Sequence, residues 1–219
     1  MKYRRVTLIC GHYGSGKTNI AVNMALDLRK QYDKVSLADL DIVNPYFRAM
    51  DSKALMEEND IGFICSPYAN SNIDIPAMPP EMYSIRDDRS TYAILDIGGD
   101  ERGALALGRL APFILEENDY EMLMVVNCHR PLTTDVPSTL VVKEEIENAC
   151  GIRFTGIINN SNLGRETTTQ IVLDSLSYAE DVSKATGLPI VMTTVEQSLY
   201  PELAPRIDGL FPLTLTEIP

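Results

Sequence analysis

The sequence predicts an α/β fold: a mostly parallel sheet with helices on both faces, arranged as a three-layer sandwich. Short apolar runs alternate along the chain with stretches of helical periodicity. The runs are apolar at consecutive positions, as expected of strands that a parallel sheet buries on both faces. A glycine-rich segment joins the first run to the first helix, and two later runs end in aspartates. Together these observations predict a doubly covered parallel sheet with its chemistry at the carboxyl edge.

Six of the apolar runs are predicted to be strands of this sheet. They are Val6–Cys10, Lys34–Ala38, Tyr92–Asp96, Met122–Val126, Phe154–Ile158 and Pro189–Met192. A helix is predicted after Lys17, and further helices over residues 103–117, 136–149 and 167–186. Four prolines between positions 67 and 80 predict loops over residues 55–90, with room for one short strand near Gly62–Ile64. No linker or repeat interrupts the pattern, so residues 1–219 are expected to form one domain.

The composition narrows the class of partner. The formal net charge of −12 argues against binding to DNA, RNA or anionic membrane lipid, which require a basic surface. The spacings of the four cysteines match no zinc-binding pattern. No run is long enough to span a bilayer or to form the core of a signal peptide, so a cytoplasmic location is expected.

A phosphate-binding loop is predicted directly after the first strand. Gly11, Gly16, Lys17 and Thr18 satisfy the pattern G-x-x-x-x-G-K-[ST]. The glycines let successive backbone N–H groups point inward around phosphate oxygens, and the positive end of the following helix adds to the attraction. Lys17 is expected to contact the β- and γ-phosphates, and the Thr18 hydroxyl is expected to bind Mg²⁺. The residues assigned to this site are Gly11, His12, Tyr13, Gly14, Ser15, Gly16, Lys17, Thr18 and Asn19.

Two acidic stretches follow neighbouring strand candidates. Asp39 and Asp41 end the second predicted strand, and Asp96 ends the third, followed by Gly98 and Gly99. Parallel strands bring such residues to the edge that holds the phosphate loop. Asp96 is therefore predicted to hold Mg²⁺, with Asp39 also near the metal and Asp41 orienting the attacking water. A backbone N–H at Gly99 is expected to approach the γ-phosphate, while a simple turn-capping role stays open for the aspartates.

With these motifs, the chain resembles the MinD/ParA branch of P-loop ATPases, which includes the CobQ/CobB-type domains. The phosphate loop, Asp39-x-Asp41 and Asp96-x-x-Gly99 carry the resemblance, which extends from about residue 5 to residue 200. It implies a P-loop NTPase sandwich, ATP or ADP as nucleotide, Mg²⁺, and a role for Asp39, Asp41 and Lys17 in hydrolysis.

The resemblance also implies a base contact late in the chain. The family reads adenine with an Asn that ends a G-x-x-x-N strand, which indicates Asn160 here, with Asn159 as the alternative. The segment Thr193–Glu196 would form a wall of the base pocket. No N-K-x-D pattern, typical of dedicated GTPases, is present, so adenine is favoured over guanine.

One position departs from the family. Where the family's loop has a lysine that reaches the nucleotide of a second subunit, this chain has His12. A neutral imidazole can donate a hydrogen bond but supplies no fixed charge, so a homodimer of that kind is only one of the open possibilities. The proline-containing end of the chain lacks the basic residues of the family's membrane-binding helix.

These features predict a slow, Mg²⁺-dependent ATPase that acts as a switch on a partner protein or in the maturation of a metalloenzyme or cofactor. Two alternatives stay open: a small-molecule kinase or CobB-like transferase, with Arg86 and Arg89 in a lid, and a nucleotide-sensing module without hydrolysis. Cys128-His129-Arg130 follows the fourth predicted strand at the same edge. The Cys-His pair could ligate a metal, and Arg130 could contact a phosphate or a partner.

Overall fold

A computed structural model describes residues 3–40, 45–65, 81–98 and 107–215, with the backbone alone for 45–51. Within these residues eight strands form one sheet in the order β3-β2-β4-β1-β5-β6-β7-β8. Every neighbouring pair is parallel. The strands are β1 (Val6–Cys10), β2 (Val35–Leu40), β3 (Gly62–Cys65), β4 (Tyr92–Ile97), β5 (Tyr120–Val126), β6 (Gly156–Asn159), β7 (Ile190–Glu196) and β8 (Leu210–Leu213).

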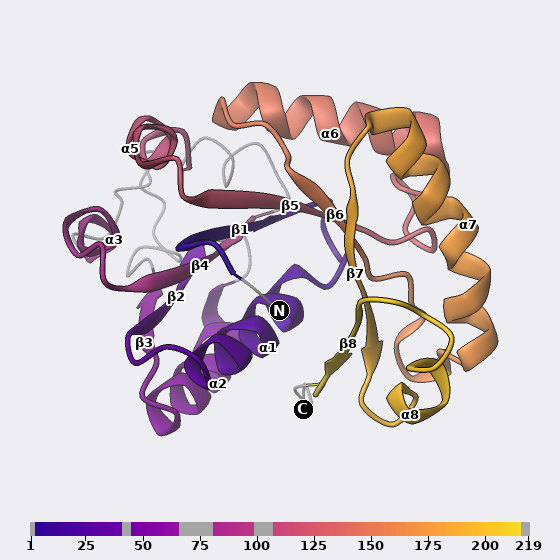
Figure 1. Cartoon of the computed structure of the whole chain (residues 1–219), viewed down its shortest axis with the longest axis horizontal. Helices are drawn as coiled ribbons and strands as arrows, with labels where there is room; N and C mark the ends of the chain where they lie inside the picture. Colours follow the sequence, from indigo (N-terminus) through magenta and orange to yellow (C-terminus); the bar gives the residue numbers. More distant parts are fainter. Residues whose placement is uncertain (1–2, 41–44, 66–80, 99–106, 216–219) are drawn as a thin grey trace.

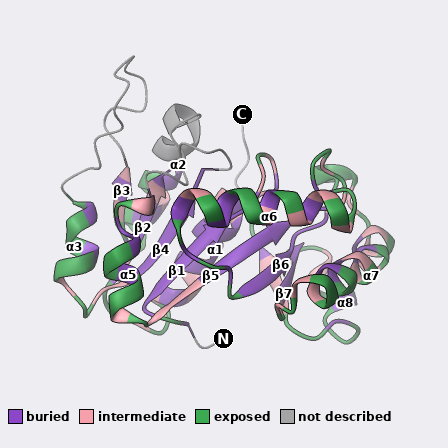
Figure 2. Cartoon of the chain, turned by 90° about the horizontal axis from the view of Figure 1, so that it is seen from above, coloured by how far each residue is buried: buried purple, intermediate pink, exposed green. Residues whose placement is uncertain are grey.

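Helices cover both faces of the sheet (Figure 1). One face carries α1 (Lys17–Arg29) and α2 (Pro45–Glu58), and the other carries α3 (Met82–Asp87), α5 (Ala111–Glu117), α6 (Val136–Cys150) and α7 (Thr169–Thr186). The short α8 (Tyr200–Leu203) packs with α7 and β7. Figure 2 shows the central strands buried between helices whose outer faces are exposed.

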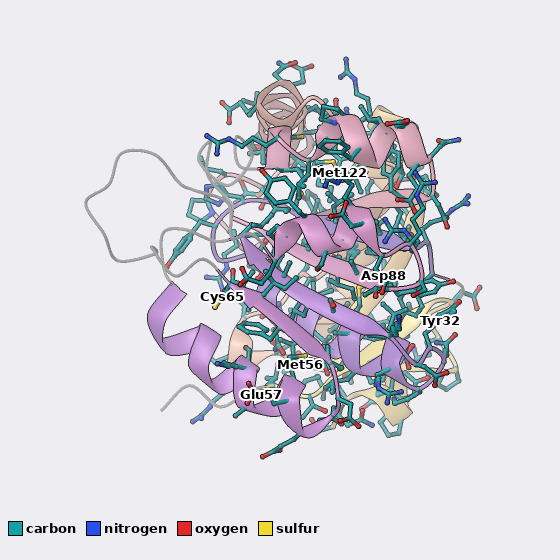
Figure 3. All side chains as sticks on the ribbon, turned by 90° about the vertical axis from the view of Figure 1, so that its left-hand side faces the viewer. Tyr32, Met56, Glu57, Cys65, Asp88 and Met122 are labelled. Atoms are coloured by element: carbon teal, nitrogen blue, oxygen red, sulfur yellow. The ribbon has the colours of Figure 1, made fainter. Side chains whose placement is uncertain are left out.

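Two apolar cores result from the alternation of side chains along the strands. Ile9, Leu37 and Ile94 pack against α1 in one core, whereas Leu8, Leu95 and Met124 face the helices on the other side. In Figure 3, Met56 of α2 and Met122 of β5 lie on opposite sides of the sheet. Both methionines are fully buried, so the sheet is the middle layer of a three-layer sandwich.

The structure confirms the six predicted strands and the short strand near Gly62, with boundary shifts of a few residues. The prediction of loops over residues 55–90 was wrong in part, because α2 extends to Glu58 and α3 lies within that range. Of the helix predicted over residues 103–117, residues 103–106 lie outside the described part of the chain, residues 107–108 are helical, and a turn at residues 109–110 separates them from α5. Pro112 lacks an N–H and is tolerated in the first turn of a helix, which fits the start of α5 at Ala111.

The end of the chain also differs from expectation. Residues Leu210–Leu213 form an additional strand, β8, although Pro212 lies inside it. In the described sheet β8 pairs on one side only, with β7. A proline is compatible with a strand at an edge, because no neighbour needs its missing N–H.

Candidate nucleotide-binding site

The segment between β1 and α1 folds into the predicted phosphate loop. The Ser15 N–H donates a 3.2 Å hydrogen bond to the His12 carbonyl, which closes a turn. Gly14 and Gly16 have φ values of +74° and +92°, a region that residues with side chains rarely adopt. Gly16 is also the N-cap of α1, so the first N–H groups of the helix open toward the loop. This is the arrangement in which backbone N–H groups cradle an anion.

Steric constraints explain two of the three glycines in the loop. A Cβ on Gly11 would lie 2.4 Å from the Val125 carbonyl oxygen of the neighbouring strand β5. A Cβ on Gly16 would lie 2.3 Å from Nδ2 of Asn160. The loop therefore packs directly on the ends of β5 and β6, and only glycine fits at these two positions.

Lys17 holds a positive charge beneath the loop. Its side chain is 5% exposed, and its ammonium donates a 3.2 Å hydrogen bond to the His12 carbonyl. Within the described residues it makes no ion pair with a carboxylate. Thr18 and Asn19, in the first turn of α1, are half-buried, whereas Ser15 is fully buried. A buried ammonium without a carboxylate favours an anionic ligand.

The two described acidic candidates lie side by side. Asp39 of β2 and Asp96 of β4 are direct neighbours in the parallel register, and Asp96 also neighbours Ile9 of β1. The alternation along each strand puts them on the face covered by α1, where the phosphate loop ends. Asp96 is 2% exposed and Asp39 is half-buried.

The thiol of Cys10, at the end of β1, lies in the field of these charges. Burial raises its pKa well above the ordinary value, with a further rise from Cys150 and a smaller one from the Asp96 carboxylate, while Lys17 opposes the rise. Besides Cys150, the groups that act on Cys10 thus include a cation and a carboxylate at this end of the sheet, the kinds of group that a phosphate–metal site requires.

The other two acidic-loop candidates, Asp41 and Gly99, lie outside the described residues. The oxygen donors Thr18, Asp39 and Asp96 fit a hard divalent cation such as Mg²⁺. No three His, Cys, Asp or Glu side chains in the described chain gather closely enough to hold a metal by themselves. A small donor set of this kind suits Mg²⁺, which keeps most of its ligands from water and phosphate.

The two asparagines proposed for base binding point to opposite faces of the sheet. Asn159 is fully buried, and its amide donates a 3.0 Å hydrogen bond to Ser175 of α7. Asn160, one residue later, faces α1, and its amide donates a 2.6 Å hydrogen bond to the Ser15 carbonyl in the phosphate loop. The Thr194 hydroxyl donates to the side-chain oxygen of Asn160, Oδ1, at 2.6 Å. Of the two candidates, Asn160 is therefore the one that adjoins the phosphate loop.

A buried asparagine that the sequence analysis did not single out organises the neighbouring loop. Asn127 follows β5, is fully buried, and accepts the N–H of His129 on its side chain at 2.9 Å. Its amide donates to the Asn162 carbonyl at 3.3 Å, and Ser161 accepts the N–H of Cys128 at 3.1 Å. The loops after β5 and β6 are thus joined by hydrogen bonds. The only signal in the sequence was a polar residue directly after five apolar ones.

The remaining loop residues are more accessible. His12 is half-buried, with Nδ1 3.0 Å from the Tyr13 carbonyl, and the Tyr13 side chain is 52% exposed. Cys128 is half-buried, and His129 is exposed. The Cys-His pair has no third described ligand within reach of a shared metal ion, so the structure gives no support to a metal site there.

Solved structures with a similar fold include FtsY proteins and a signal recognition particle protein. The cell division protein FtsY of Thermotoga maritima matches with a TM-score of 0.61 at 18% identity, over 87% of this chain and 61% of that one. The signal recognition particle receptor FtsY of Elizabethkingia anophelis in complex with GDP matches with a TM-score of 0.54 at 16% identity, over 89% and 58%. The 54 kDa signal recognition particle protein of Aeropyrum pernix in complex with GDP gives 0.52 at 18%, over 88% and 41%.

The chain spans about three fifths or less of the length of these structures. No protein-family model matches it, and no curated protein does. None of the described helices is both long and apolar enough to cross a membrane. At these identities the comparison concerns the fold alone. The eight-stranded parallel sheet of the described residues, with its covering helices and its glycine loop after β1, is the α/β fold of the P-loop nucleotide-binding NTPases.

Proposed function

We propose that the chain binds a purine nucleoside triphosphate with Mg²⁺ and hydrolyses it slowly, as a nucleotide-dependent switch of the MinD/ParA-like type. The observation that supports this most is Lys17, whose buried ammonium contacts only a loop carbonyl among the described residues. A phosphate oxygen can replace that neutral acceptor and gain a charge-assisted hydrogen bond. The backbone N–H groups of residues 14–18 would bind the remaining phosphate oxygens.

ATP is the preferred nucleotide in this proposal. Reading guanine requires a carboxylate that accepts its N1–H and exocyclic amine, as the Asp of N-K-x-D does. Asn160 is followed instead by Ser161, Asn162 and Leu163, none of which is acidic. Because two of the compared structures contain GDP, guanine nucleotides are the control that any binding experiment must include.

The side chains at the carboxyl edge of the sheet suggest a role for each residue in this proposal. Thr18 and Asp96 would hold Mg²⁺, with Asp39 beside them, and the ion would offset the negative charge of the phosphates. Asp41 would orient the attacking water in line with the bond to the leaving phosphate. The N–H of Gly99 would sense the γ-phosphate. Loss of that phosphate would release the segments after β2 and β4 and change the affinity for a partner protein or client enzyme.

One observation weighs against the kinase alternative. The guanidinium carbon of Arg86 lies 5.3 Å from the ring centre of Tyr83 and 5.1 Å from that of Phe113. Arg86 is thereby engaged on the outer surface of α3 and α5, rather than free to serve a lid. Hydrolysis or sensing is therefore favoured over phosphoryl transfer to a metabolite.

Phosphate release from Mg-ATP and Mg-GTP tests the proposal. The wild type is expected to release phosphate from ATP slowly, and faster than from GTP. Asp41→Ala should abolish release while ATP binding persists, because the water would lose its orienting group. Binding without release in the wild type would instead favour the sensing module. Faster release from GTP than from ATP would contradict the assignment of the base.

A further inference from the structure

Arg130 lies against the phosphate loop from the neighbouring β5 loop. A Cβ on Gly14 would lie 3.7 Å from Arg130 Nε and 3.9 Å from both its Cδ and Cζ. The guanidinium end of Arg130 therefore lies beside the loop backbone, within van der Waals reach of a Cβ at position 14. Its Nε is buried and donates no hydrogen bond within the described residues.

The backbone of Arg130 is firmly held. Its N–H donates to the Asn127 carbonyl at 3.0 Å, and its own carbonyl accepts the Thr133 N–H at 2.9 Å. The Thr133 hydroxyl donates to the same Asn127 carbonyl at 2.7 Å. Asn127 and Thr133 are both fully buried. The side chain of Arg130 thus starts from a rigid turn, which lowers the entropy cost of aiming it at a ligand.

No carboxylate neutralises this guanidinium within the described residues. Arg5 and Lys143 are paired with carboxylates, Glu117 and Glu147 respectively, whereas in the described part of the chain Arg130 shares the lack of a carboxylate partner with Lys17 of the phosphate loop. In a chain with a net charge of −12, a partly buried arginine without such a partner is unusual. A buried N–H without an acceptor is costly, so the arrangement favours an anion that arrives from outside.

We propose that Arg130 binds the phosphate chain of the nucleotide held by the same subunit. The inference rests on the proposed function and adds a second fixed cation to the site, on a different loop from Lys17. A guanidinium offers several N–H donors in one plane and can hold two phosphate oxygens at once. Arg130 is a phosphate-binding residue in this proposal.

Titration calorimetry with ADP on three variants tests the inference. Arg130→Met keeps much of the length of the side chain and removes the charge, and Arg130→Lys restores the charge. Arg4→Met removes an exposed arginine that pairs with Asp119 at the opposite edge of the sheet, as a control for net charge. We expect Arg130→Met to raise the Kd for ADP by about tenfold or more, Arg130→Lys to recover part of the affinity, and Arg4→Met to leave it unchanged.

The dependence of the Kd on salt separates a charge contact from a packing role. Loss of a phosphate contact should make ADP binding by Arg130→Met less sensitive to ionic strength than binding by the wild type. Thermal unfolding of the nucleotide-free variants verifies that they fold. If Arg130→Met binds ADP like the wild type while Lys17→Ala does not, the nucleotide site stands and the role of Arg130 is refuted. If the wild type binds no nucleotide at all, the proposed function fails and this inference fails with it.

Discussion

The amide of Asn160 donates a 2.6 Å hydrogen bond to the carbonyl of Ser15, and so ties the end of β6 to the phosphate loop. The Asn160 side-chain oxygen accepts from Thr194, at the end of β7, in a site that is almost fully buried. The segment proposed to read the base is thereby fixed to the segment proposed to hold the phosphates. A nucleotide that spans both would find them already in position.

Asn160→Ala should weaken both the fold and nucleotide binding. The substitution removes the hydrogen bond to the buried Ser15 carbonyl and leaves the Thr194 hydroxyl only its longer, 3.4 Å contact with the Asn159 carbonyl, which costs about 1–3 kcal/mol of unfolding free energy. Thr194→Val is the matched control, because it removes one of these hydrogen bonds and leaves the contact with Ser15. Urea unfolding and ADP titration provide the two measurements. Equal effects of the two substitutions on ADP affinity would argue against a role of the Asn160–Ser15 contact in binding.

Gly11→Ala should lower the free energy of unfolding far more than Gly151→Ala does. Its Cβ would meet the Val125 carbonyl at 2.4 Å, so either β5 or the phosphate loop must move. Gly151 caps α6 with a φ of +75° and has nothing within 4 Å of its Cβ position, so Gly151→Ala carries only the backbone strain, about 1 kcal/mol. We expect Gly11→Ala to lose at least about 2 kcal/mol by urea unfolding and to abolish ADP binding. Similar losses for both variants would show that the close approach to β5 is unimportant.

Glu147 should make stability depend on pH. Burial alone would raise its pKa, but hydrogen bonds from the Phe154 N–H, Lys143 and Arg153 outweigh burial and hold the pKa below its ordinary value. A carboxylate with a lowered folded-state pKa stabilises the fold above its unfolded-state pKa, and this contribution is lost as the pH falls through the folded-state value.

Glu147→Gln should therefore cost more unfolding free energy at pH 7 than at pH values below the unfolded-state pKa of Glu, about 4.3. Urea unfolding of the wild type and the variant across this range measures the difference. Glu145→Gln, which changes an exposed glutamate on the same helix, is the control. If the unfolding free energies of the wild type and Glu147→Gln differed by the same amount at all pH values, the lowered pKa of Glu147 would be contradicted.

Asp96→Asn should reduce the contribution of Mg²⁺ to nucleotide binding. An amide keeps the size of the side chain but loses the charge that attracts a divalent cation. We expect the affinity for ATP in the presence of Mg²⁺ to fall about tenfold, and the affinity in EDTA to change little. Asp39→Asn, at the neighbouring and more exposed register position, should have the smaller effect. If Mg²⁺ raised the affinity for ATP equally in the wild type and in Asp96→Asn, Asp96 would not be a ligand of the metal.

The elements that the sequence predicted best are those with strong local signals. The central strands are apolar on both faces, and the phosphate loop combines a required motif with required glycines. The sequence favoured Asn160 over Asn159 for the base contact only through the family's G-x-x-x-N pattern, and that role stays a prediction. The structure adds where the two side chains lie, with Asn159 hydrogen-bonded to α7 and Asn160 to the phosphate loop.

Features that depend on tertiary context were missed. The short α3 is six residues long and has little periodicity to detect. The strand β8 contains a proline, which is acceptable only because of its place at the edge of the described sheet. The position of Arg130 beside Gly14 arises from the pairing of β1 with β5, which no local pattern encodes.

The binding of Mg-ATP and Mg-GTP to the wild type and to Lys17→Ala, measured by titration calorimetry, tests the central claim most directly. We expect the wild type to bind Mg-ATP more tightly than Mg-GTP, and Lys17→Ala to bind Mg-ATP at least about tenfold more weakly, about 1.4 kcal/mol. The alanine removes the buried ammonium that would otherwise meet the phosphates. A wild type that binds neither nucleotide, or a Lys17→Ala variant that binds Mg-ATP unchanged, would contradict the assignment of a nucleotide site.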